Sequence, residues 1–169
     1  MKHRIKNSQN ISRNCLVCGA ENEFGLKTRF YETEDNQVVA LFQALPQHQS
    51  YPNVTHGGIS VAILDEVVGR AIMVFHDAES FGVTVELKLR YQKPVPIGVE
   101  LKAIGRITVD SGRIFEGTGE IYLPDGQVAV SAEGRYLRRR LDQITDSAFI
   151  ANEWWPPLEE SPEEISLPS

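Results

Sequence analysis

Residues 59–76 carry the longest apolar stretch of the 169-residue chain, and this stretch predicts one long helix. Apolar side chains fall on almost every face of the segment, which is typical of a helix that is buried on most sides. His56-Gly57-Gly58 precedes it, and Thr55 is a candidate N-cap. In a chain of single-domain size, the rest of the protein has to wrap such a helix.

Short segments of strand-like sequence lie on both sides of the predicted helix. The segment 84–91 alternates apolar and polar residues with a period of two, as a half-buried strand does. Turn sequences such as Pro124-Asp125-Gly126 join the later segments, so we expect an antiparallel meander. The predicted strands are 27–32, 38–45, 84–91, 99–109, 113–123 and 127–137. The predicted fold is α+β, with a curved antiparallel sheet wrapped round one long central helix.

The pattern weakens towards both ends of the chain. Residues 1–14 are polar, and we expect a flexible N-terminus. The folded domain is predicted to span residues 15–140. Residues 141–169 form a C-terminal extension, which we expect to hold a short helix within 141–155 and to be disordered over 156–169, where Pro, Glu and Ser dominate.

Composition excludes several classes of function. The net charge of −6 lacks the basic footprint of a nucleic-acid-binding protein. The apolar stretch is interrupted by Asp65, Glu66 and Arg70, and it is too short to span a membrane. Residues 1–13 have no apolar core, so no signal peptide is predicted. Two cysteines make no disulfide framework, and the cytoplasm is therefore the expected location.

His56-Gly57-Gly58, at the predicted helix start, is a candidate site for polarising a carbonyl group. The first N–H groups of a helix lack internal partners, and the helix dipole places partial positive charge there. Such groups stabilise the oxyanion of a tetrahedral intermediate. The alternative is that two glycines merely allow a tight turn into the helix.

Asp65 is the second candidate, because a carboxylate within an apolar helix has to be paired, protonated or exposed to a pocket. It could serve as a general base for water or as a nucleophile; the alternative is a structural ion pair. Its neighbour Glu66 stands four residues before Arg70, the favourable order for a helix-surface ion pair. Glu66 is therefore expected to be structural.

Helix geometry predicts that the two candidates act across a subunit interface. Asp65 lies seven residues after Gly58, on nearly the same helix face but roughly 10 Å further along the axis. One subunit would therefore not bring them to the same carbonyl. Two antiparallel helices would set each Asp65 opposite the other subunit's Gly57-Gly58, and so we expect a two-fold dimer.

Two further candidates carry weaker signals. Thr84 begins the strand after the helix, and its hydroxyl could bind water or the acid, although threonine is also an ordinary strand residue. Cys15 and Cys18 have the spacing of half a zinc knuckle. Because no second pair follows, we expect a structural loop and no metal.

Two features near the C-terminal end have open interpretations. The basic run Arg138–Arg140 is typical of a solvated strand end, and alternatively could contact the phosphates of coenzyme A. Trp154-Trp155 could cover an apolar surface or an oligomer contact.

Taken together, these segments resemble the hotdog-fold acyl-CoA thioesterase superfamily, and within it the phenylacetic-acid-degradation (PaaI-like) type. The resemblance extends over about residues 15–138. It is carried by HGGISVAILDEVVG (56–69), TVELKLRYQKPVPIG (84–98) and SGRIFEGTGEIYLPDGQVAVSAEGRY (111–136), with CLVCGAENEFGL (15–26) and HQSYPNVTHGG (48–58) ahead of the helix.

The resemblance implies hydrolysis of an acyl-CoA or acyl-carrier thioester to a free acid and a thiol, by a homodimer or homotetramer without cofactor or metal. By position, Asp65 is the catalytic carboxylate, and Gly57 and Gly58 polarise the carbonyl. His56 orients the site and Thr84 assists the acid. Some members carry Asn or Gln before the His-Gly-Gly segment. Two residues here, Gln49 and Asn53, are candidates for that substrate-binding role.

Two other functions are compatible with the same fold. One is a non-catalytic acyl-CoA-binding or regulatory protein, which would not need the acid at position 65. The other is a dehydratase or hydratase, which usually has a His–Asp or His–Glu pair that this helix lacks.

Overall fold

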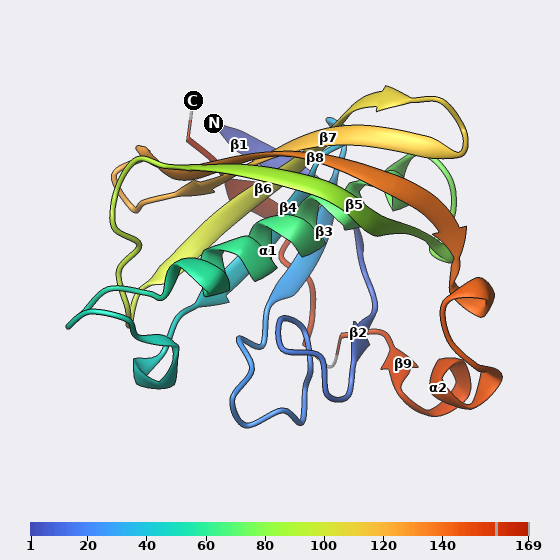
Figure 1. Cartoon of the computed structure of the whole chain (residues 1–169), viewed down its shortest axis with the longest axis horizontal. Coiled ribbons are helices and arrows are strands. Elements are labelled where there is room, and N and C mark those ends of the chain that lie inside the picture. The colour runs from blue at the N-terminus through green and yellow to red at the C-terminus, as the bar shows by residue number, and fades with distance from the viewer. Residues whose placement is uncertain (158, 169) are drawn as a thin grey trace.

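The computed structural model describes residues 1–157 and 159–168, and in it a large sheet curves round helix α1 (Figure 1). Eight strands pair antiparallel in the order β10-β1-β3-β4-β6-β7-β8-β5, and β2 pairs with β9. The strands are β1 Lys2–Ser8, β2 Ile11–Ser12, β3 Arg29–Thr33, β4 Val38–Gln43, β5 Ser80–Tyr91, β6 Glu100–Asp110, β7 Ile114–Tyr122, β8 Val128–Arg140, β9 Trp154–Trp155 and β10 Glu164–Ser166. The helices are α1 Gly57–Arg70 and α2 Ser147–Asn152, with short 3₁₀ turns at Pro46–His48, Ala71–Val74 and Leu141–Gln143. The predicted α+β arrangement is confirmed.

Helix α1 packs directly against the middle strands of the sheet. Its fully buried side chains Ile63, Leu64, Val67 and Val68 form the centre of the core. The sheet meets them with glycine: a Cβ added to Gly105 would lie 2.4 Å from the carbonyl oxygen of Val67. The helix backbone can therefore approach the sheet more closely than side chains would allow.

Strand β5 runs alongside α1 in the opposite direction. Tyr91, at the end of β5, donates a hydrogen bond from its hydroxyl to the carbonyl of Gly57, the first residue of α1 (2.9 Å). At the other end, a Cβ on Gly82 would lie only 3.1 Å from the Cα of Gly69. Because neither glycine has a side chain, the two segments can touch here. This contact determines which residues of β5 lie next to each turn of α1.

The helix begins one residue later than the predicted cap implies. His56, rather than Thr55, is the N-cap, and its side chain accepts a hydrogen bond from the Gly58 N–H. Thr55 is buried, and its hydroxyl donates to the carbonyl of Pro96 (3.2 Å). The prediction of Thr55 as N-cap is therefore wrong. The α-helix ends at Arg70, and a 3₁₀ turn over Ala71–Val74 follows it, so the predicted helix to residue 76 is too long.

The chain ends differ from the flexible segments predicted for residues 1–14 and 156–169. Strand β1 pairs with β3 on one side and with β10 on the other, so the two ends of the chain extend the sheet. Ile165 and Leu167 are buried against Tyr31 and Ile104 in a second apolar cluster. These few apolar contacts order the C-terminal segment, which is otherwise polar. Two positions of the predicted disordered range, 158 and 169, lie outside the described residues.

No helix in the ranges 1–157 and 159–168 is both long and apolar enough to cross a membrane.

We expect Gly105→Ala to lower the free energy of unfolding by about 1–3 kcal/mol, because its methyl group would press on the backbone of α1. Urea unfolding at one fixed protein concentration measures this. Thr108→Ala, at an exposed position of the same strand, is the control and should change stability by no more than about 0.5 kcal/mol. Equal stability of the two variants would show that the helix does not need the glycine.

Candidate functional site

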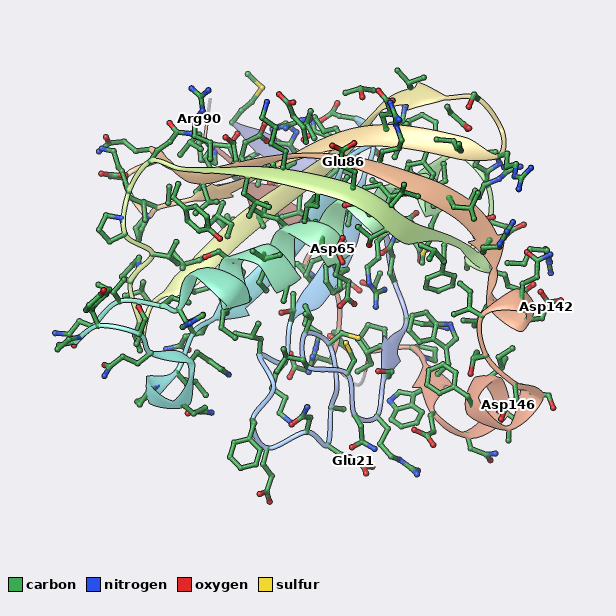
Figure 2. The ribbon with its side chains drawn as sticks, viewed as in Figure 1. Glu21, Asp65, Glu86, Arg90, Asp142 and Asp146 are labelled. Carbon is green, nitrogen blue, oxygen red and sulfur yellow. The ribbon has the colours of Figure 1, made fainter. Side chains whose placement is uncertain are left out.

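Asp65 lies midway along α1 (Figure 2). Its carboxylate accepts one hydrogen bond. The Thr84 hydroxyl donates to Asp65 Oδ1 at 2.7 Å, which confirms that the two residues are adjacent. The second oxygen, Oδ2, has no hydrogen-bond partner within the described ranges, and the carboxylate forms no ion pair with any described residue. One oxygen is thus fixed while the other remains available.

Tyr136 supports the same residue from the sheet. Its hydroxyl donates to the backbone carbonyl of Asp65 (3.3 Å), and its ring is fully buried and stacked on Phe115. Burial, followed by the nearby charge of Asp65, raises the pKa of Tyr136 well above its usual value. The tyrosine therefore stays protonated and acts as a neutral donor that fixes the helix beneath the acid.

The two glycines at the start of α1 differ in their hydrogen bonds. The Gly58 N–H donates to His56 Nδ1 at 2.9 Å, so this amide is already used. The Gly57 N–H, at the first helical position, has no acceptor among the described residues. At the positive end of the helix dipole, Gly57 is therefore the better donor for an incoming carbonyl oxygen.

His56 presents its other nitrogen to the outside. Because Nδ1 accepts from the Gly58 amide, the neutral ring carries its proton on Nε2. The residue is exposed. Its Nε2–H can therefore donate to a ligand next to the Gly57 amide.

Gln49 and Asn53 lie together in the loop that leads into α1. Gln49 Oε1 accepts a hydrogen bond from the backbone N–H of Asn53 (3.2 Å). Asn53 has a left-handed φ of 63°, which asparagine tolerates better than most residues. Both have a role in shaping this loop. Their predicted substrate contact stays a prediction.

The structure does not bring Asp65 to the helix start within one chain. Eight residues separate it from Gly57 along the same helix, which corresponds to about 12 Å of axial rise. The described chain therefore joins Asp65 to Thr84, and Gly57 to Tyr91, as two separate half-sites.

A polar cluster that sequence reasoning only partly anticipated lies beside Asp65. Arg70 Nε donates to Glu66 Oε1 at 2.8 Å, which confirms the predicted helix pair. Arg70 is nevertheless buried, with further bonds to the Asn10 carbonyl (2.9 Å) and Cys18 Sγ (3.3 Å). Its guanidinium also lies 4.3 Å from the ring centre of Phe30. This arginine joins the N-terminal loop to the helix.

The cysteines complete that cluster, because Cys15 Sγ donates to Glu66 Oε2 at 3.4 Å. The Sγ atoms of Cys15 and Cys18 and a Glu66 oxygen lie within 4.8 Å of one another, which is compact enough to ligate a metal ion. The guanidinium of Arg70 already places a positive charge next to Cys18 and Glu66. This charge disfavours binding of a metal cation there. A hydrogen bond with Cys18 lowers the pKa of Cys15, and that bond together with burial raises the pKa of Cys18.

The basic run at the end of β8 forms local ion pairs. Arg140 pairs with Glu79, and Arg138 contacts His76. These contacts give the run a structural role at the β5–β8 edge. Contact with coenzyme A phosphates remains a prediction.

An apolar cavity of about 440 Å³ opens beside Asp65. Sequence reasoning missed this cavity, because its walls come from three segments far apart in the chain: the Cys15–Cys18 loop, the α1–β5 contact and the C-terminal extension. Trp154, whose role was open, is one of its lining residues.

Comparison with known proteins agrees with the geometry of the central helix and sheet. A family model described as the thioesterase superfamily matches residues 52–130, a range that contains Gly57, Asp65 and Thr84. The matched range covers less than half of this chain. Acyl-coenzyme A thioesterase THEM4 of Mus musculus is 31% identical over 68 residues, which are 40% of this chain and 28% of that protein.

Several solved structures share the hotdog fold of this chain. A thioesterase superfamily protein of known crystal structure is 31% identical, with a TM-score of 0.68 over 75% of this chain and 61% of its own. The Haemophilus influenzae thioesterase HI1161 is 15% identical, with a TM-score of 0.64 over 73% and 86%. The E. coli PaaI protein of the phenylacetic acid degradation operon is 15% identical, with a TM-score of 0.60 over 68% and 80%.

This chain spans less than a third of the length of the mouse relative and less than two thirds of the first of these structures. The family match also ends before the C-terminal extension begins.

We expect Arg70→Met to lower the free energy of unfolding by about 3–5 kcal/mol, because it leaves the Glu66 charge without its partner beside the core. Chemical unfolding measures the change. Arg113→Met, which removes an exposed arginine, is the matched control and should have little effect. Adding Glu66→Gln to Arg70→Met should recover part of the loss, and no recovery would show that charge pairing is not the cause.

Proposed function

We propose that this chain hydrolyses an acyl-CoA or acyl-carrier thioester to a free acid and a thiol. The observation that carries the proposal is the Asp65 carboxylate, which is fixed by Thr84 and free of any ion pair among the described residues, at the wall of an apolar cavity. A structural carboxylate in such a place would normally be paired. The thioesterase family match supports the same chemistry.

In the proposed reaction, Asp65 activates a water molecule. The free Oδ2 accepts a proton from water as the water oxygen attacks the thioester carbonyl carbon. Negative charge then develops on the carbonyl oxygen, and the Gly57 N–H at the helix start stabilises it. When the tetrahedral intermediate collapses, the carbon–sulfur bond breaks and the proton passes to the leaving thiolate. Direct attack by Asp65, through an anhydride, would use the same groups.

A homodimer would unite the two half-sites. β5 is an edge strand of twelve residues, and Val83, Val85 and Tyr91 on it are exposed. A long edge strand with exposed apolar residues is a template for pairing with another chain. Antiparallel pairing of two β5 strands about a two-fold axis would also bring the two α1 helices together antiparallel, because each helix runs alongside its own β5.

This arrangement would place Asp65 of one subunit near Gly57 of the other, with two equivalent sites in each dimer. A tetramer could form from two such dimers. We retain the cytoplasm as the expected location, because both cysteines are free thiols.

Asp65→Asn should reduce kcat/KM for thioester hydrolysis by at least about 100-fold, because asparagine cannot accept the proton from water. The fold should be unchanged, since the amide oxygen can still accept from Thr84. Free-thiol release across acyl-CoA substrates measures the rate. Asp35→Asn, at the exposed turn between β3 and β4, is the control. A rate near that of the wild type would remove Asp65 from the mechanism.

Mixing two inactive variants tests the shared site. Gly57→Pro removes the free amide at a position where proline suits the helix start, and Asp65→Asn removes the acid. In a heterodimer of the two, one site would hold both defects and the other would be intact. Random pairing should therefore restore about a quarter of wild-type activity after coexpression of the two chains. Activity no higher than that of the separate variants would place each site within one subunit.

A further inference from the structure

The cavity beside Asp65 has a wall that the family match does not cover. Its residues from the family-matched region are on α1 and β5, including Ala62, Gly69 and Phe81. The opposite wall comes from the C-terminal extension after β8. The extension residues that line the cavity are Leu141, Ile144, Thr145, Phe149 and Trp154. This wall is therefore a feature of this chain beyond the matched domain.

The extension is held in place at both ends. At its start, the Leu141 N–H donates to the Glu79 carbonyl (2.9 Å). Further along, β9 pairs with β2, which places Trp154 opposite Ser12 and Trp155 opposite Ile11. The Asp146 side chain caps α2 by accepting from the Phe149 N–H (2.9 Å). Figure 1 shows this segment below the sheet, beside β2. The wall is therefore built into the fold.

Aromatic rings join the extension to the catalytic region. Trp154 packs edge-on against Phe81 of β5 with ring centres 5.4 Å apart, and it stacks near Phe149 at 6.5 Å. Its ring also lies 5.2 Å from the Arg70 guanidinium. A substrate group that enters the cavity past Asp65 would meet these apolar surfaces.

The charges round the cavity disfavour a negatively charged acyl group. Arg70 is the only cationic residue among the described lining residues, and its guanidinium is already bonded to Glu66, Cys18 and the Asn10 carbonyl. Asp65 and Glu66 would repel a carboxylate on the acyl group. An uncharged apolar acyl chain fits this lining, and the cavity of about 440 Å³ lies in the usual size range of small-molecule sites.

We propose that the C-terminal extension completes an acyl pocket beside Asp65 and makes this chain selective for medium-chain apolar acyl groups over acetyl. The inference rests on the proposed thioester hydrolysis. Because each methylene group moved from water into an apolar pocket is worth about fourfold in kcat/KM, the rate should climb with chain length until the pocket is full.

The first test measures kcat/KM for acetyl-, butyryl-, hexanoyl-, octanoyl- and palmitoyl-CoA. We expect octanoyl-CoA to exceed acetyl-CoA by at least about 100-fold. Ile144→Trp, at a half-exposed position of the wall, should fill the pocket and lower the octanoyl-to-acetyl ratio by about tenfold or more. Trp154→Ala should change the same ratio, whereas Trp155→Ala should not, because Trp155 faces Ile11 and does not line the cavity.

A flat chain-length series, or an unchanged ratio in Ile144→Trp, would overturn the pocket while leaving the thioesterase proposal intact. Because Ile144 is partly exposed, this variant is expected to fold even if Trp154→Ala does not.

A binding measurement separates failure of the pocket from failure of the hydrolase. In Trp155→Phe, Trp154 is the one remaining tryptophan of the chain, so its fluorescence reports on the wall. With Asp65→Asn added to stop turnover, octanoyl-CoA should change the emission of Trp154 at concentrations where acetyl-CoA does not. If no acyl-CoA is hydrolysed by the wild type but this difference is seen, the pocket stands and the hydrolase proposal fails. If octanoyl-CoA and acetyl-CoA change the Trp154 emission equally, or if neither changes it, the acyl-pocket proposal is overturned.

Discussion

The close contact between α1 and the sheet determines where the candidate catalytic groups of this protein lie. Glycine at position 105 allows the helix backbone to rest directly on β6, and Gly69 and Gly82 allow α1 and β5 to touch. With these contacts, Thr84 can reach Asp65, and Tyr91 can reach Gly57. A side chain at Gly105 or Gly82 would separate the layers, and the hydrogen bonds that fix the acid and the helix start would lengthen with them.

Arg70 adds a second constraint at the other end of the helix. A buried arginine is stable only when its donors are satisfied, and here Glu66, Cys18 and the Asn10 carbonyl satisfy them. Through these bonds the Cys15–Cys18 loop is tied to α1, one turn beyond Asp65. The same guanidinium lies beside Trp154, so the loop and the C-terminal extension are positioned by one residue of the helix. This explains how segments distant in sequence can form a single cavity.

The sequence predicted the central helix and the main strands because their signals are local. Alternation along 84–91 and the turn at Pro124-Asp125-Gly126 depend only on neighbouring residues. The ends of the chain could not be predicted in this way, since Lys2 pairs with Ser166 and only the sheet between them brings them together. The candidate residues around Asp65 were identified, yet the cavity was not, because its walls are assembled by long-range packing.

The unpartnered groups of the single chain point to one common cause. The Asp65 Oδ2 atom and the Gly57 amide lack partners among the described residues, and the backbone of β5 lies at the sheet edge with apolar side chains exposed. An unpaired edge strand invites association with another chain, and the first amide of a helix has no acceptor within the helix, so these groups are available to a partner or a ligand. A two-fold dimer formed through β5 would act on all three groups at once: the β5 edge, the Asp65 carboxylate and the Gly57 amide. The edge would pair, the helices would meet, and the acid and the amide would face a shared substrate carbonyl. Separate explanations would need three unrelated partners, and symmetry therefore gives the simpler account of how a chain with two half-sites would carry out the proposed hydrolysis of one thioester.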